Sequence, residues 1–255
     1  MRSMKALPIL AVLCVLAILE ACAGRKAVRH DHGTEATAQY RMAQAYFRGG
    51  RITEALATME KAQALAPQNP EMWNFYGQIS FLGGRYSQAE KAYQKALELD
   101  PYVTDVHNNL GALYDRLGRK AEAEEQYRTA LADTAYATPE KVHFNLGILY
   151  SSQGRQEEAV KELRKAVEID PRYYQAHFEL AGRLEATGRL EEAAREYEVA
   201  APDYRNSGDY HYRLGFTYLR LGDKVKAGEH LRRVLEVSPG SENAARADDL
   251  LKTVR

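Results

Sequence analysis

The sequence has little cysteine and no surplus of charge of either sign. Two cysteines among 255 residues, Cys14 and Cys22, cannot supply a network of disulfides. The 35 basic and 35 acidic side chains cancel and are mixed along the chain, so the basic surface expected of a nucleic-acid-binding protein is missing. The composition therefore gives no reason to expect a nucleic-acid partner.

Recognisable catalytic motifs are also absent. The chain has no serine, histidine and aspartate order typical of hydrolases, no glycine-rich phosphate loop and no HExxH metal motif. The glycine pairs at 49–50 and 83–84 fit helix-ending turns better, and the many glutamates are expected on solvated helix faces. No alternation typical of strands competes with the helical pattern. The sequence thus disfavours an enzyme and predicts neither a cofactor nor a small-molecule substrate.

The longest apolar run is confined to the start of the chain. It covers residues 6–19 and follows the basic residues Arg2 and Lys5. A helix of this length is too short for a bilayer core of about 30 Å. Residues 1–21 are therefore predicted to be an export signal, with an uncleaved anchor or a buried helix as the alternatives.

The end of this run, Leu19 to Cys22, resembles a bacterial lipobox, in which the signal is cut before a cysteine that is then acylated. Cleavage would remove Cys14 and leave Cys22 alone as the acyl acceptor. Glu20 departs from the pattern, which usually has a small or uncharged residue there. Ala23 follows the cysteine, at the position where an aspartate would retain a lipoprotein in the inner membrane. The resemblance therefore implies the outer membrane. Residues 22–35 are predicted to form a polar tether.

A period of 34 residues governs the rest of the chain. The frames are 36–69, 70–103, 104–137, 140–173, 174–207 and 208–241, with Thr138 and Pro139 inserted after the third. Position 15 of each frame is glycine: Gly50, Gly84, Gly118, Gly154, Gly188 and Gly222. Position 20 is alanine in all six frames, and position 8 is Ala43, Gly77, Gly111, Gly147, Ala181 or Gly215. A period of this length indicates a solenoid of repeated units.

The repeated residues have physical roles. Glycine at position 15 can end a first helix, because it adopts the left-handed conformation cheaply. Small residues at positions 8 and 20 let two helices approach closely, and proline at position 32 in four frames stops the second helix. The pattern resembles the tetratricopeptide repeat. We therefore expect an all-α, right-handed superhelical solenoid of six helix pairs, with residues 242–255 as a capping helix.

Histidine recurs at position 4, as His107, His143, His177 and His211. A shared metal site is disfavoured, because equivalent positions in neighbouring repeats lie roughly 10 Å or more apart, and zinc ligands must lie about 2 Å from one ion. We interpret the four histidines as substitutes for a packed aromatic residue, like Trp73 in the second frame. An enzyme that uses these histidines, or His30 and His32 of the tether, is the alternative.

The family resemblance places the first helices along the concave face, where a partner would bind. The predicted groove residues are Asn108, Phe144, Ile148, Phe178, Tyr212 and Phe216. Exposed apolar rings on a solenoid favour docking of a helix or an extended peptide segment. The alternative is that some of these rings pack in the seams between repeats.

Two stretches, 130–150 and 231–242, are similar to the type IV pilus biogenesis lipoproteins, also called secretin pilotins. That resemblance implies a non-catalytic scaffold that is anchored in the outer membrane, faces the periplasm and binds secretin subunits during their assembly. The alternative within the same class is a lipoprotein adaptor for other envelope complexes, such as those of cell-wall hydrolases.

Overall fold

The computed structural model describes residues 32–254. The predicted signal segment, Cys22 and most of the predicted tether lie outside these residues. The first described helix, α2 (His32–Arg48), begins four residues before the first repeat frame at residue 36. Residues 32–35, which the sequence placed in the tether, form the start of α2.

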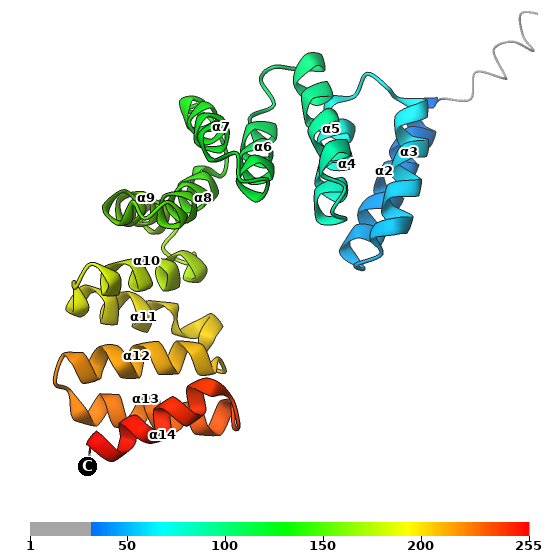
Figure 1. Ribbon diagram of the computed structural model, residues 1–255. Coiled ribbons are helices and arrows are strands. Elements are labelled where there is room, and N and C mark those ends of the chain that lie inside the picture. Colours follow the sequence, from blue (N-terminus) through cyan, green and yellow to red (C-terminus); the bar gives the residue numbers. More distant parts are fainter. Residues whose placement is uncertain (1–31, 255) are drawn as a thin grey trace, which may run out of the picture. The chain divides into compact units, whose positions relative to one another are not determined.

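The described residues form thirteen helices and no strand (Figure 1). After α2 come α3 (Ile52–Leu65), α4 (Pro70–Leu82), α5 (Tyr86–Leu99), α6 (Thr104–Arg116), α7 (Lys120–Ala132), α8 (Pro139–Ser152), α9 (Gln156–Ile169), α10 (Tyr174–Ala186), α11 (Leu190–Tyr204), α12 (Gly208–Arg220), α13 (Lys224–Val237) and α14 (Glu242–Val254). Consecutive helices pack as pairs, and α14 packs on α12 and α13. The prediction of an all-α array with six helix pairs and a terminal capping helix is confirmed.

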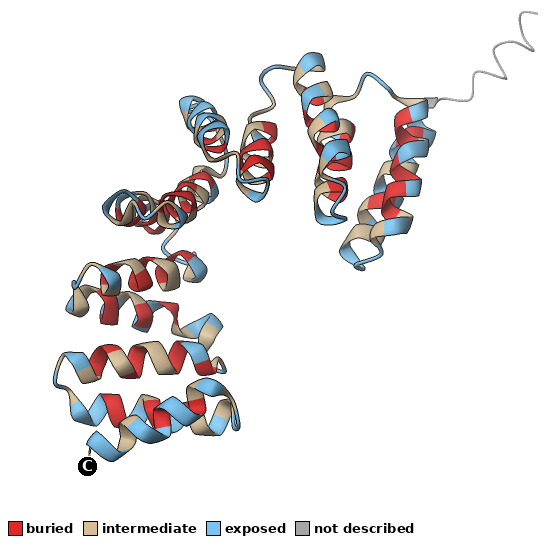
Figure 2. Cartoon of the chain, viewed as in Figure 1, coloured by how far each residue is buried: buried red, intermediate tan, exposed pale blue. Residues whose placement is uncertain are grey.

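The chain divides into two compact units, one ending at Val106 and the other beginning at His107. In the first unit, α2 to α5 enclose a core around Leu56, Met59 and Ile79. The rings of Tyr40 and Phe47 each meet Phe75 edge-on at 5.4 Å between centroids. This unit therefore has its own packed interior, which Figure 2 shows as the buried sides of facing helices.

The second unit contains three consecutive cores along α8 to α14. Leu163 and Leu180 belong to the first, Tyr197 and Leu214 to the second, and Leu231 and Val234 to the third. The last core is closed by Ala244 and Ala247 of α14, both at most 5% exposed. The capping helix thus covers apolar surface that the sixth pair would otherwise leave open.

Glycine is required at position 15 of every repeat, and at position 8 of some repeats. All six position-15 glycines have φ between 71° and 81°, the left-handed region that a side chain disfavours. At position 8, a Cβ on Gly147 would lie 2.5 Å from Cγ of Leu163, and one on Gly111 would lie 2.5 Å from the Tyr127 ring. The first glycine turns the chain, and the second lets the two helices touch.

An arginine after the turn glycine connects the two helices of a pair. The Arg155 guanidinium lies 4.0 Å from the Tyr150 ring centroid and pairs with Glu158 on the next turn of α9. Arg119 repeats this arrangement over Tyr114. The sixth pair reverses the charges, because Asp223 caps α13 and Lys226 lies over the Tyr218 ring at 4.7 Å. In these three pairs, the contacts join the end of the first helix to the first turn of the second.

Candidate protein-binding surface

The predicted groove residues all lie on first helices of the second unit, but they are not equally accessible. Asn108 on α6 accepts a hydrogen bond of 2.9 Å from Nδ2 of Asn145 on α8. Asn108 was predicted to line the groove that binds a partner. In the structure the two asparagines link two neighbouring repeats to each other, so part of their hydrogen-bonding capacity is already used within the fold.

Phe144 is a core residue. Its side chain is only 9% exposed, and its ring lies 5.1 Å from that of Tyr173, in the turn that follows α9. Ile148, one turn further along α8, is half-buried against the same core. For Phe144 the expectation of an exposed groove ring is therefore wrong, and the alternative of seam packing holds. The ring that buries it comes from the following turn, which the position of Phe144 in the repeat did not reveal.

Phe178 is half-buried between rings of its own repeat. It stacks on Tyr204 at 4.5 Å with an interplanar angle of 12°, and it meets Tyr197 edge-on at 5.5 Å. The Arg213 guanidinium lies 5.6 Å from its centroid. Tyr204 and Arg213 therefore take up much of the contact surface that a partner would need, and Phe178 contributes mainly to packing.

Tyr212 and Phe216 form the most open part of the predicted groove. Both are half-buried on α12, and their rings are parallel at 6.2 Å between centroids. They line a hollow of about 280 Å³, which we call the first-helix hollow because α10, α12 and α14 form it. Its lining residues are Glu185, Asp209, Tyr212, Arg213, Phe216, Asn243 and Arg246.

The charges of the first-helix hollow are balanced. Nε of Arg213 lies 2.9 Å from a carboxylate oxygen of Asp209, and Arg246 pairs with Glu242 on its own helix. Glu185 accepts a 3.3 Å hydrogen bond from the hydroxyl of Tyr197 and lies 3.5 Å from Arg220. A hollow with paired charges and two parallel rings suits a peptide segment with apolar side chains better than an isolated ion.

Several lining residues of this hollow were not singled out from the sequence. Asp209 and Glu185 occupy positions 2 and 12 of their frames, on the first helices that the family resemblance places along the concave face. Asn243 and Arg246 come from the capping helix, which has no repeat frame to indicate its inward face. The repeat pattern could therefore have indicated Asp209 and Glu185, but not Asn243 and Arg246.

The position-4 histidines connect the helices of a pair and neighbouring turns. Nδ1 of His107, His143 and His177 lies 2.6–2.8 Å from a side-chain oxygen of Gln126, Glu162 and Glu196, each 19 residues later. In the sixth pair the equivalent partner of His211 is Nδ1 of His230, at 3.1 Å. The interpretation as aromatic substitutes was therefore incomplete, because these rings also bond across the pair.

The opposite ring edge bonds backward along the chain. Nε2 of His177 donates to the carbonyl oxygen of Pro171 at 3.2 Å, and Nε2 of His211 to that of Arg205 at 3.0 Å. Trp73 makes the same bond to Pro67 at 2.8 Å. The residue at position 4 thus ties the last turn of one repeat to the next, which explains why only rings with an N–H group occupy it in these three frames.

Comparison with known proteins agrees with the repeat pattern. Models of the tetratricopeptide repeat match residues 40–104, 81–136 and 209–241, and a TPR repeat model matches residues 147–181. The chain is a tetratricopeptide-repeat protein. Proteins of this class are generally non-catalytic scaffolds that bind other proteins. No curated protein sequence matches it significantly.

The fold of this tetratricopeptide-repeat protein resembles those of several solved proteins. PilW, described as a widely conserved type IV pilus biogenesis factor, is 26% identical with a TM-score of 0.73, over 86% of this chain and 97% of PilW. PilF of Pseudomonas aeruginosa has the same fold, at 19% identity and a TM-score of 0.77, over 86% of this chain and 99% of that one. YrrB, described as a TPR protein with an unusual peptide-binding site, is 22% identical over 75% of this chain, covers 97% of that chain and has a TM-score of 0.61.

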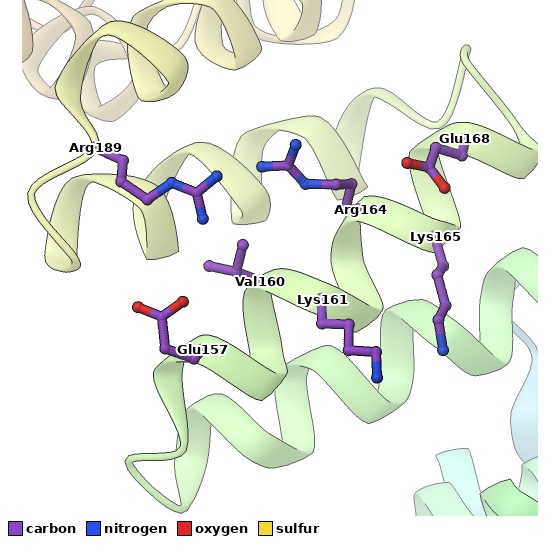
Figure 3. Close-up of a pocket in the computed structure, with 7 residues that line it drawn as sticks. All are labelled: Glu157, Val160, Lys161, Arg164, Lys165, Glu168 and Arg189. Carbon is purple, nitrogen blue, oxygen red and sulfur yellow. The ribbon is translucent and has the colours of Figure 1, made fainter.

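The opposite face of the repeats has a second hollow, of about 350 Å³, between α9 and the start of α11 (Figure 3). Arg164 and Arg189 point toward each other there, and both bind Glu192, at 2.9 and 2.7 Å. These two arginines lower the pKa of Glu192 to about 2. The two arginines thus share one carboxylate, which links α9 of the fourth pair to α11 of the fifth.

Two further observations limit the chemistry of the described part of the chain. Residues 32–254 contain no group of three or more His, Cys, Asp or Glu side chains placed to hold a metal ion. Within the same residues, no helix has both the length and the apolar character needed to cross a bilayer.

Proposed function

We propose that this protein is a non-catalytic scaffold that binds secretin subunits of a type IV pilus and assists their assembly in the outer membrane. In this proposal, cleavage leaves Cys22 as the acylated first residue, and the repeats face the periplasm. Stable attachment requires more than one acyl chain, since a single chain binds membranes only marginally.

The observation that carries the proposal is the similarity to PilW over 97% of the length of that pilus biogenesis factor. The likeness extends over 86% of this chain, at 26% identity. The lipobox-like segment ending at Cys22 supports the membrane anchor.

We propose the first-helix hollow as part of the contact surface for the secretin. Tyr212 and Phe216 provide two accessible rings on one helix, and aromatic anchors in partly desolvated hollows are typical binding hot spots. The paired charges around them can accept the backbone groups of a peptide segment without leaving an isolated charge buried.

The test is affinity capture from solubilised outer membranes with the full-length protein, followed by mass spectrometry for a secretin. The double variant Tyr212→Ala and Phe216→Ala should lose the capture. The matched control is Tyr102→Ala, which removes an aromatic side chain that is 89% exposed and lies in the first unit. Absence of any secretin from the wild-type capture would refute the proposed function. Equal capture by wild type and the double variant would refute only the proposed surface.

A further inference from the structure

The histidine bond of the sixth helix pair differs chemically from the equivalent bonds of the other pairs. Position 23 holds an amide in Gln126 and carboxylates in Glu162 and Glu196, but a second histidine in His230. His211 is 8% exposed, and the rings of the two histidines stack at 5.3 Å with an angle of 29°. A pair of identical titratable rings, one buried and one half-buried, therefore replaces an ordinary donor–acceptor pair.

The hydrogen bonds determine where the protons must lie in the neutral pair. The carbonyl oxygen of Arg205 can only accept, so Nε2 of His211 carries the proton and its Nδ1 is a lone-pair acceptor. Nδ1 of His230 must then be the donor in the 3.1 Å contact. A first added proton can reside on the outer nitrogen of His230 without breaking this bond. A second puts N–H groups on both facing nitrogens, which then repel each other.

The fifth pair has the opposite requirement. His177 lies between the carboxylate of Glu196 at 2.6 Å and the carbonyl oxygen of Pro171 at 3.2 Å, and neither partner has a proton to give. Both partners of His177 are acceptors, so neither of its ring nitrogens faces an N–H group. In the sixth pair, by contrast, full protonation brings two N–H groups face to face.

The surroundings of the sixth pair strengthen this difference. Burial lowers the pKa of His211 and of His230 below 6.5, and the proximity of His211 lowers that of His230 further. The charged and titratable neighbours are Glu198 of α11, Tyr210 and Tyr218 of α12, and Lys226, Glu229, Arg233 and Glu236 of α13. Glu198, the carboxylate on α11, already accepts hydrogen bonds from Tyr218 and Lys226.

We propose that the His211–His230 pair makes the sixth repeat acid-sensitive, so that protonation loosens α12 from α13 while the preceding repeats stay packed. The sign follows from linkage: in acid the unfolded repeat binds two protons at this site and the packed repeat binds fewer, so stability falls as pH decreases below about 6.5. Stability at this site is fully present above that range.

The loosened helix is the one that carries the partner-binding rings. Tyr212 directly follows His211, and Phe216 lies one turn further along α12. Separation of α12 from α13 would therefore distort the first-helix hollow, and acid would release the bound partner. This binding consequence rests on the proposed function, whereas the effect on the packing of the repeat does not.

The test is hydrogen exchange by mass spectrometry on the full-length protein at about pH 5 and about pH 8, corrected for intrinsic exchange. Peptides from α12 and α13 should lose protection in acid relative to peptides from α8 and α9. Between the unfolded pKa of about 6.5 and the lower folded-state pKa, each proton taken up on opening raises the opening constant by about tenfold per pH unit.

Two substitutions of His230 change the group that faces Nδ1 of His211. His230→Gln copies the amide of the third pair and should remove the acid-induced exchange. His230→Glu copies the carboxylate of the fifth pair. In this variant acid should increase the protection of α12 and α13 instead of lowering it, because the carboxylate would stabilise His211 as the imidazolium. Glu196→Gln, the matched change in the fifth pair, should leave exchange in α12 and α13 unaltered.

The same acid response in wild type and in His230→Gln would overturn the proposal. Proton NMR of the wild-type protein gives a second test that needs no variant: His211 and His230 should titrate below 6.5, and titration of both at or above that value would also overturn it. Secretin capture at the two pH values is measured separately. Failure to capture a secretin at either pH would count against the proposed function and leave the exchange result standing.

Discussion

Repeats four and six hold an aromatic residue at the same position of the first helix, yet the two rings have different environments. Phe144 is 9% exposed beneath Tyr173, which follows α9. Tyr212 is half-buried, and the turn after α13 reads Ser-Pro-Gly-Ser and supplies no ring to cover it. The contrast shows that accessibility on a repeat surface is decided by the turn that follows the pair, and not by repeat position alone.

The largest expected effect is on the stability of repeat four. Phe144→Ala should cost roughly 3 kcal/mol, because it removes a buried ring from a closed core and leaves a cavity. Tyr212→Ala should cost well under half of that, since solvent already reaches its ring. Chemical denaturation of both variants in parallel measures the difference, and equal losses would contradict the comparison.

The second expected effect is on binding, where Tyr212→Ala should be more damaging than Phe144→Ala. Tyr212→Ala should weaken secretin affinity by about 2 kcal/mol, roughly thirtyfold, if its ring is a hot spot of the proposed surface. Phe144→Ala should reduce binding only in proportion to unfolding. Titration of each purified variant with a secretin fragment gives the two affinities, and a weaker effect at Tyr212 than at Phe144 would move the contact surface elsewhere.

The sequence alone was sufficient for the helix pairs and their turns but not for this difference in exposure. Gly147 and Gly154 determine a close helix contact and a left-handed turn through local geometry, which a 34-residue period reveals directly. The cover of Phe144 by Tyr173 depends on a ring 29 residues away. Contacts of that kind depend on how a turn is directed, and no periodic pattern encodes the direction.

The histidines illustrate the same limit. Their recurrence at position 4 was evident, and so was the improbability of a shared metal site. Their partners, 19 residues later, vary among amide, carboxylate and imidazole, so no single motif marked them. The preference for histidine at this position is explained by the carbonyl oxygens of Pro171 and Arg205, which accept hydrogen bonds at the opposite ring edge. A sequence pattern does not reveal these bonds.

The third expected effect concerns the close contact between the two helices of a pair. Gly147→Leu should cost about 1–3 kcal/mol, because even a Cβ there lies 2.5 Å from Cγ of Leu163. The control is Gly182→Ala on α10, whose added Cβ would meet no atom closer than 3.7 Å. Thermal melting should therefore fall for the first variant and stay level or rise slightly for the second, since alanine favours helix over glycine. A melting temperature unchanged by Gly147→Leu would contradict the packing described here.

The smallest expected effect concerns the charged turns, which also differ between repeats. Arg189 of the fifth pair and Arg164 of the fourth hold the pKa of Glu192 at about 2, whereas the sixth pair has Asp223 and Lys226 in reversed order. A depressed pKa contributes stability above the unfolded value of 4.5, and this contribution is lost as pH falls toward 2. Because solvent screens the exposed arginines, the contribution should be only about 0.5 kcal/mol. Glu192→Gln should lower stability by that amount at neutral pH and by nothing near pH 2, which denaturation at the two pH values can resolve. A loss that persists in acid would show that Glu192 acts through packing, and the two kinds of turn would then differ in shape rather than in charge.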